Sequence, residues 1–209
     1  MKEIIVVGET LVDIIRKANT PEKKVLGGAP LNVARTIARL KAYSGLNLRF
    51  LSSFNKKDKF GNIVKEGIAY SNIPIFDGVD SFMQTNTAIA NIDKNGNSTY
   101  EFSYIGEPET IFTPKEKFNL ENILGFYAGS VSSQFILNGE KKYTPILGLY
   151  KYMAENDVLT FYDPNIRPSI IPDKKIVLEI VLEYIKNSFV LKVSDEDIRW
   201  LYGEDFDLL

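Results

Sequence analysis

The chain has 209 residues and a formal charge of −2, from 25 basic and 27 acidic side chains. It has no cysteine and no histidine, which excludes disulfides, thiolate nucleophiles, histidine bases and histidine metal ligands. There is no basic tract, so neither nucleic acid nor a membrane is an expected partner. Any chemistry must therefore use carboxylates, amides, hydroxyls, lysine, arginine or the backbone.

The first segment predicts a buried strand over residues 3–8, followed directly by Glu9 and Asp13. In open α/β sheets, ligands collect outside the carboxyl ends of the strands, which makes these acids candidate ligand-binding residues. No basic segment or long apolar run precedes the strand, so we expect a cytoplasmic protein without a membrane span. The segments 12–17 and 23–27 predict two further short strands around a turn.

Residues 27–40 predict a tight turn followed by a helix. Gly27 and Gly28 permit a sharp turn and a close approach of the backbone to a ligand. Pro30 suits the first helical turn, whose free amides face the space in front of the glycines. Asn32 lies in that turn and is able to pair with a hydroxyl. On these residues alone, a purely structural helix start after a tight turn is the favoured interpretation.

Apolar spacing predicts the inner faces of this helix and of a second helix over residues 58–70, with a strand over 47–53 between them. The residues expected to be buried on the two helices are Val33, Ile37, Leu40, Phe60, Ile63, Val64 and Ile68.

Residues 86–104 predict a β-hairpin, because Asn95-Gly96 lies between two extended runs. One face of the second run carries Tyr100, Phe102 and Tyr104. Such an aromatic stripe is usually sheet core, but it also suits the wall of a lid with one ring against a ligand.

The second half of the chain alternates between strand-like and helical segments, which predicts a largely parallel, doubly wound α/β sheet. The expected strands are 124–129, 158–162 and 188–193, and the expected helices are about 140–155, 174–186 and 195–202. We expect one domain over 1–209, with lid elements at about 12–27 and 86–104.

Two polar groups follow expected strands in this half. The first contains Asp163, Asn165 and Arg167, an acid, an amide and a guanidinium that suit a polyol or a phosphate. Its structural interpretation is an ion pair between Arg167 and Asp163. The second, residues 194–197, fits either a helix start capped by Ser194 or a water-mediated Mg²⁺ site.

Together these segments resemble the ribokinase-like (PfkB) carbohydrate kinases, and within them the fructokinase-type branch. The resemblance rests on residues 7–13, 27–34, 127–130, 161–168 and 191–197, and above all on Gly-Gly-Ala-Pro-x-Asn combined with Asp-Pro-Asn-x-Arg. It implies a three-layer α/β/α sandwich with a small β-sheet lid, and a possible homodimer formed through the lid. It also implies transfer of the ATP γ-phosphate, with Mg²⁺, to a primary hydroxyl of a neutral sugar, most simply fructose.

The resemblance also implies roles for individual residues. The implied sugar ligands are Asp13, Gly27, Gly28, Asn32, Phe102, Tyr104, Asn165 and Arg167. Arg167 would also stabilise the phosphoryl group, and Asp197 would hold Mg²⁺ through water, in a Ser-x-x-Asp that replaces the family's Asn-x-x-Glu.

Two departures from the family pattern affect the expected activity. Tyr104 is followed by Ile105 where relatives often have arginine, which favours a neutral over an acidic sugar. Relatives also continue past the position of Leu209 to a Gly-Ala-Gly-Asp motif that forms an anion hole and supplies the base. We therefore expect a chain that is truncated at its C-terminus and inactive alone. The alternatives are a catalytically inactive sugar-binding module or partner subunit, and a nucleoside kinase.

Overall fold

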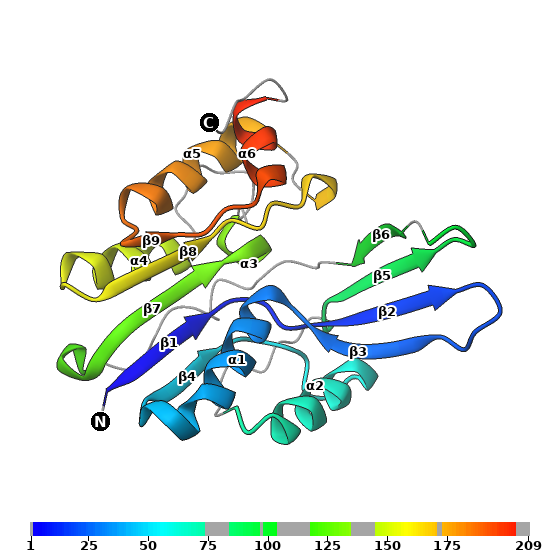
Figure 1. Ribbon diagram of the computed structural model, residues 1–209, viewed down its shortest axis with the longest axis horizontal. Coiled ribbons are helices and arrows are strands. Elements are labelled where there is room, and N and C mark those ends of the chain that lie inside the picture. Colours follow the sequence, from blue (N-terminus) through cyan, green and yellow to red (C-terminus); the bar gives the residue numbers. More distant parts are fainter. Residues whose placement is uncertain are drawn as a thin grey trace.

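The computed structural model describes residues 2–73, 84–96, 98–103, 118–134, 145–170 and 173–203, which form two β-sheets and their covering helices (Figure 1). The larger sheet has the strand order β4-β1-β7-β8-β9, and the smaller has the order β3-β2-β5-β6. The strands of the larger sheet are β1 (Glu3–Val7), β4 (Asn47–Leu51), β7 (Ile123–Gly129), β8 (Leu159–Asp163) and β9 (Val190–Leu191). Those of the smaller sheet are β2 (Leu11–Lys17), β3 (Lys23–Gly27), β5 (Thr87–Ile92) and β6 (Ser98–Ser103). The helices are α1 (Ala29–Ser44), α2 (Lys59–Tyr70), α3 (Ser130–Gln134), α4 (Pro145–Glu155), α5 (Lys174–Lys186) and α6 (Asp195–Tyr202), with 3₁₀ turns η1 (Leu120–Asn122) and η2 (Pro168–Ile170).

The larger sheet is parallel throughout and is covered on both faces, as the alternating segments predicted. β1 shows why: Ile5 and Val7 face the core under α4 and α5, whereas Val6 faces the core under α1 and α2. A strand buried on both faces needs an uninterrupted apolar run, and residues 4–7 supply one. The predicted three-layer α/β/α arrangement is confirmed.

An aromatic cluster fills the core beneath α4 and α5. The rings of Tyr162 and Tyr184 stack with their centroids 4.4 Å apart, and Tyr150 meets Tyr184 edge-on at 5.0 Å. All three side chains are almost completely buried. This packing joins α4, α5 and β8 and so fixes the end of β8 from which a candidate site loop departs.

The smaller sheet lies beside the larger one and is covered on one face by α2 (Figure 1). Val12, Ile14 and Leu26 point toward α2, where Val64 and Ile68 are buried. The other face carries Asp13, whose register partner across the sheet is Ala88, and Ala88 in turn lies opposite Phe102. The sheet therefore has one apolar core face and one face that is open to a ligand.

Some expectations about these elements are wrong in detail. Leu40 is 55% exposed, because Leu31 and Ala34 carry the buried face of α1, with Val33 and Ile37 only partly covered. The strand expected over 188–193 is shorter in the structure, where only Val190 and Leu191 pair with β8. Tyr104 and the start of the helix expected over 140–155 lie outside the described residues.

Among the described residues, no helix combines the length and apolarity that a membrane crossing requires. The organisation of the chain as one domain stays a prediction.

We expect the substitution Tyr184→Ala to lower the free energy of unfolding by about 3–5 kcal/mol, because it removes a ring packed between two others and leaves a cavity. Urea denaturation followed by circular dichroism measures the change. The control is Tyr70→Ala, which removes a side chain that is 89% exposed and should change stability by less than about 0.5 kcal/mol. Equal effects of the two substitutions would contradict the assignment of the core.

Candidate functional site

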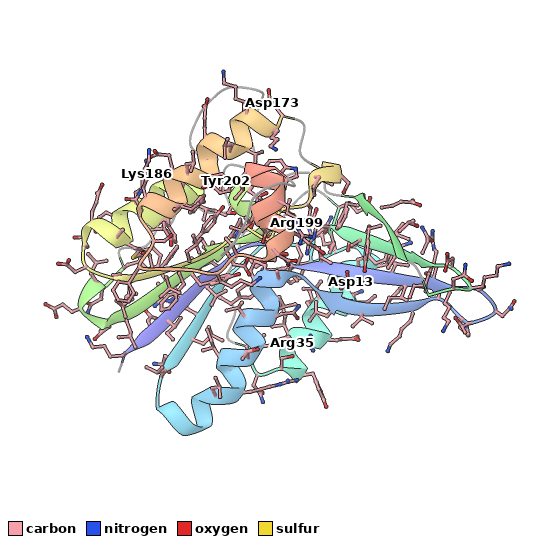
Figure 2. All side chains as sticks on the ribbon, turned by 45° about the horizontal axis from the view of Figure 1, so that its top comes forward. Asp13, Arg35, Asp173, Lys186, Arg199 and Tyr202 are labelled. Atoms are coloured by element: carbon pink, nitrogen blue, oxygen red, sulfur yellow. The ribbon has the colours of Figure 1, made fainter. Side chains whose placement is uncertain are left out.

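A cleft with a volume of about 610 Å³ lies between the open face of the smaller sheet and the carboxyl ends of β1, β7 and β8. Figure 2 shows Asp13 on the smaller sheet. The first turns of α1 and α6 line the same cleft through Asn32 and Glu196. The sequence-predicted residues that line this cleft are Asp13, Gly28, Asn32, Phe102, Asn165 and Arg167. Predicted residues as far apart in the sequence as Asp13 and Arg167 thus contribute to a single concave surface.

The double glycine brings the start of α1 against the connection between β1 and β2. Gly28 has φ +115°, and a Cβ there would lie 2.7 Å from the carbonyl oxygen of Glu9. A Cβ on Gly27 would collide with the carboxylate of Asp13. Gly28 lines the cleft, whereas Gly27 lies behind Asp13 and leaves room for it. The absence of side chains here permits the backbone approach that the sequence indicated.

Asp13 presents a half-buried carboxylate to the cleft. Among the described residues, none forms a hydrogen bond or an ion pair with this side chain, and burial raises its pKa above the ordinary value of 3.8. A carboxylate without a protein partner is able to accept hydrogen bonds from ligand hydroxyls. Its unpaired charge costs stability, which is typical of a binding residue and not of a structural one.

Asn32 occupies the first turn of α1, on the cleft side. Its backbone N–H donates to Gly28 O at 3.0 Å, so the helix start is closed by the backbone. The carboxamide is exposed and lines the cleft, where it is available both as a donor and as an acceptor.

Two aromatic rings of β6 form the outer wall of the cleft. Tyr100 and Phe102 stack with centroids 6.3 Å apart and planes inclined by 19°, and both line the cleft. Tyr100 is 59% exposed, so the interpretation of the stripe as sheet core is wrong for this residue. The lid-wall alternative agrees with the geometry of Tyr100 and Phe102, while Tyr104 lies outside the described residues.

The loop after β8 contributes Asn165 and Arg167. The Nη1 of Arg167 donates to Ile166 O at 3.0 Å, and in the described part of the chain no carboxylate pairs with this guanidinium. Asp163 instead forms an ion pair with Lys192 at 3.1 Å, so the expected structural pair between Arg167 and Asp163 is absent. Arg167 therefore presents its charge to the cleft.

Asp197 is 3% exposed and forms a capping box with Ser194 at the start of α6, as the structural interpretation of residues 194–197 predicted. Its Oδ2 accepts hydrogen bonds from Ser194, and its Oδ1 accepts one from Ile166 N at 2.7 Å. The side chain thus fastens the Asn165–Arg167 loop to α6. Among the described residues, no group of three or more acidic side chains is placed to hold a metal ion, and the Mg²⁺ role of Asp197 stays a prediction.

Several lining residues were not predicted as site residues. They include Leu11, Ala88 and Ser130, whereas Glu9, Tyr100 and Glu196 belong to groups that the sequence had marked as candidates. Glu9 is 2% exposed and accepts a hydrogen bond from Ser132 N at 3.1 Å. Its position after the strand expected over residues 3–8 had made it a candidate ligand-binding residue. Ser130 also follows an expected strand, but no role was predicted for it, because its side-chain partner lies 35 residues away in the sequence.

A doubly wound sheet with a small sheet beside it, and a polar cleft between the two, define a ribokinase-like α/β fold. The chain matches the model of the pfkB family carbohydrate kinases over residues 1–207. It belongs to this family, and the resemblance inferred from its motifs is confirmed.

Individual relatives agree with this assignment. The chain is 30% identical over 214 residues to the probable fructokinase-4 of Arabidopsis thaliana, covering 97% of this chain and 62% of the relative. The structure of a fructokinase from Xylella fastidiosa with bound ATP superposes with a TM-score of 0.72 at 23% identity, covering 96% of this chain and 63% of that one. A fructokinase from Vibrio cholerae O395 with fructose, ADP and calcium gives a TM-score of 0.70 at 21% identity, covering 97% and 63%. The chain thus spans less than two thirds of the length of these relatives.

We expect Asp13→Asn to stabilise the protein near neutral pH while weakening sugar binding. Because burial raises the pKa of Asp13, the native state binds this proton more tightly than the unfolded chain does. Wild-type stability therefore falls as the pH rises through the window between 3.8 and the raised pKa. Asparagine does not titrate, so the variant should be more stable than the wild type above this pH window and equally stable below it. Loss of a charged hydrogen-bond acceptor should weaken sugar binding about 10- to 100-fold.

Urea denaturation between pH 3 and 8 and calorimetric titration with fructose measure the two effects of Asp13→Asn. Glu155→Gln, which removes an exposed acid on α4, is the control and should change neither sugar affinity nor neutral-pH stability appreciably. A variant that is less stable than the wild type at neutral pH, or that binds fructose equally well, would contradict the role given to Asp13.

Proposed function

We propose that this chain forms the sugar-binding part of a kinase that phosphorylates a neutral hexose, most simply fructose. The observation that carries the proposal is the convergence on one cleft of Asp13, Asn32 and the Asn165–Arg167 loop. These groups offer the hydrogen-bond donors and acceptors that hydroxyls need, and Phe102 offers an apolar ring face beside them. The family assignment and the fructokinase relatives support the same function.

The charge of the cleft favours a neutral substrate. Among the described lining residues, Glu9, Asp13 and Glu196 carry carboxylates and Arg167 carries the one cation. An acidic sugar would bring its own charge close to these carboxylates and would be disfavoured by repulsion. A nucleoside would need a flat, apolar slot for its base, and the polar lining next to Asp13 suits a polyol better.

The residues of this chain have separate roles in the proposed reaction. Asp13 and Asn32 bind and orient sugar hydroxyls, and Phe102 excludes water from one face of the sugar. ATP supplies the phosphoryl group when it is bound. The unpaired guanidinium of Arg167 fits a phosphate, because its planar donors match phosphate oxygens. Both oxygens of Asp197 already accept hydrogen bonds, so a Mg²⁺ ion near this residue would be held through water.

The resemblance adds three expectations to this proposal. They are a homodimer formed through the smaller sheet, a cytoplasmic location and a need for Mg²⁺.

The test is fructose-induced stabilisation of the purified 209-residue protein. A ligand at about 100 times its Kd stabilises the folded state by about 2.7 kcal/mol, which corresponds to a rise in Tm of about 5–10 °C for a chain of this size. We expect this shift with fructose and a much smaller one with a keto-deoxy-gluconate or with adenosine. Absence of a shift with every neutral hexose, or a larger one with adenosine, would contradict the proposal.

Turnover separates a kinase from a binding module. We expect no sugar-dependent release of ADP from MgATP by the 209 residues alone. Release of ADP that requires fructose would show that the chain contains its own base and would overturn that expectation.

A further inference from the structure

A very short helix connects the elements that surround the cleft. α3 has only five residues, yet Ser130, Ser132, Ser133 and Gln134 are all at least 95% buried. Buried polar groups need hydrogen-bond partners, and here several partners lie in other elements. Ser132 N donates to Glu9 after β1, and Gln134 donates to the carbonyl of Pro164 after β8. α3 therefore ties together two walls of the candidate sugar site.

The bond closest to the cleft joins Ser130 to Asn165. The Nδ2 of Asn165 donates to the Oγ of Ser130 at 3.1 Å, and both residues line the cleft. Both also have left-handed backbones, with φ +61° for Ser130 and +42° for Asn165. Residues other than glycine adopt this conformation at a cost, so the surrounding structure must hold these two in place.

Ser130 does not act as an ordinary helix cap. The capping serine of α6, Ser194, has φ −88° and accepts a hydrogen bond from the N–H of Asp197 in its own helix. The hydroxyl of Ser130 instead reaches a side chain 35 residues further along the chain. A role confined to starting α3 would not account for this contact.

The contact determines how the amide of Asn165 is presented. A carboxamide has a donor end and an acceptor end, and Ser130 occupies the donor end. No other described residue donates to Oδ1 of Asn165, so this oxygen is left as an acceptor for a ligand. A site arranged in this way selects a ligand that places a hydroxyl donor at Asn165.

We propose that Ser130 is a positioning residue that orients the carboxamide of Asn165, so that Oδ1 accepts a hydrogen bond from one particular hydroxyl of the sugar. The proposal rests on the proposed sugar-binding function of the cleft. It assigns to Ser130 a part in choosing among sugars that differ in a single hydroxyl. A sugar that covers Oδ1 of Asn165 without donating a hydrogen bond to it would be penalised.

The test uses Ser130→Gly, which removes the hydroxyl and at the same time relieves the left-handed backbone, so the fold should be retained. The matched control is Ser133→Ala, which removes another buried hydroxyl of α3, one that bonds Ser130 O at 2.6 Å. Calorimetric titration with fructose and with a set of monodeoxyfructoses gives the affinities. We expect the wild type to bind one deoxyfructose at least about fivefold more weakly than fructose. Ser130→Gly should lose that discrimination, and Ser133→Ala should keep it.

A second measurement needs no sugar. In protein labelled with ¹⁵N-asparagine, the side-chain NH₂ signals of Asn165 are assigned by their loss in Asn165→Gly. We expect these signals to shift, and their protons to exchange faster with water, in Ser130→Gly but not in Ser133→Ala.

The two measurements separate the possible failures. Retained discrimination in Ser130→Gly would overturn the inference and leave the proposed function intact. Failure of the wild type to bind any sugar would overturn both the proposed function and the sugar-selecting role of Ser130. Unchanged Asn165 signals in Ser130→Gly would show that Ser130 does not orient the amide, regardless of the sugar affinities that the titrations give.

Discussion

The parallel pairing of β1 with β7 and of β7 with β8 makes three strands end at the same edge of the larger sheet. Glu9, Ser130 and the Asn165–Arg167 loop follow these strands, so the register of the sheet alone brings them to one cleft. That register depends in turn on burial of β1 from both faces, because a shift by one residue would exchange the side chains facing the two cores. The position of the site is thus a consequence of how the two cores pack.

Packing of the strands does not determine the positions of the loops that line the cleft. Buried polar contacts hold these loops in place. Asp197 reaches from α6 to the backbone of Ile166, and α3 reaches Glu9 on one side and Pro164 on the other. Each of these contacts satisfies a group that would otherwise be costly to bury, so the same bonds stabilise the fold and hold the walls of the cleft. Asp13 and Arg167 are the exceptions, since neither has a charged partner among the described residues that line the cleft. Their charges remain available to a ligand.

The sequence predicted most elements within two or three residues, because the apolar periodicities of β1, α2 and α5 agree with where those elements are buried and Asn95-Gly96 marked the hairpin. The predicted sugar-binding residues came from four separate segments, and the cleft brings six of them together. What failed depended on contacts distant in sequence. Leu40 has the spacing of a core residue, but α1 rests on the sheet through Leu31 and Ala34. α3 has no apolar periodicity that could have predicted its burial. Its buried polar groups are instead satisfied by residues that follow β1 and β8.

The two interpretations of residues 194–197, a helix cap and part of a functional site, are not exclusive. Ser194 and Asp197 form the capping box, and Asp197 also bonds the backbone at Ile166, between Asn165 and Arg167. A shorter carboxylate at this position reaches the loop at 2.7 Å, which a sequence comparison with an Asn-x-x-Glu motif does not reveal. A residue predicted to hold Mg²⁺ through water thus also fixes the loop that carries Arg167. Buried polar residues beside the cleft, such as Asp197 and Gln134, thus hold the loop that carries Asn165 and Arg167.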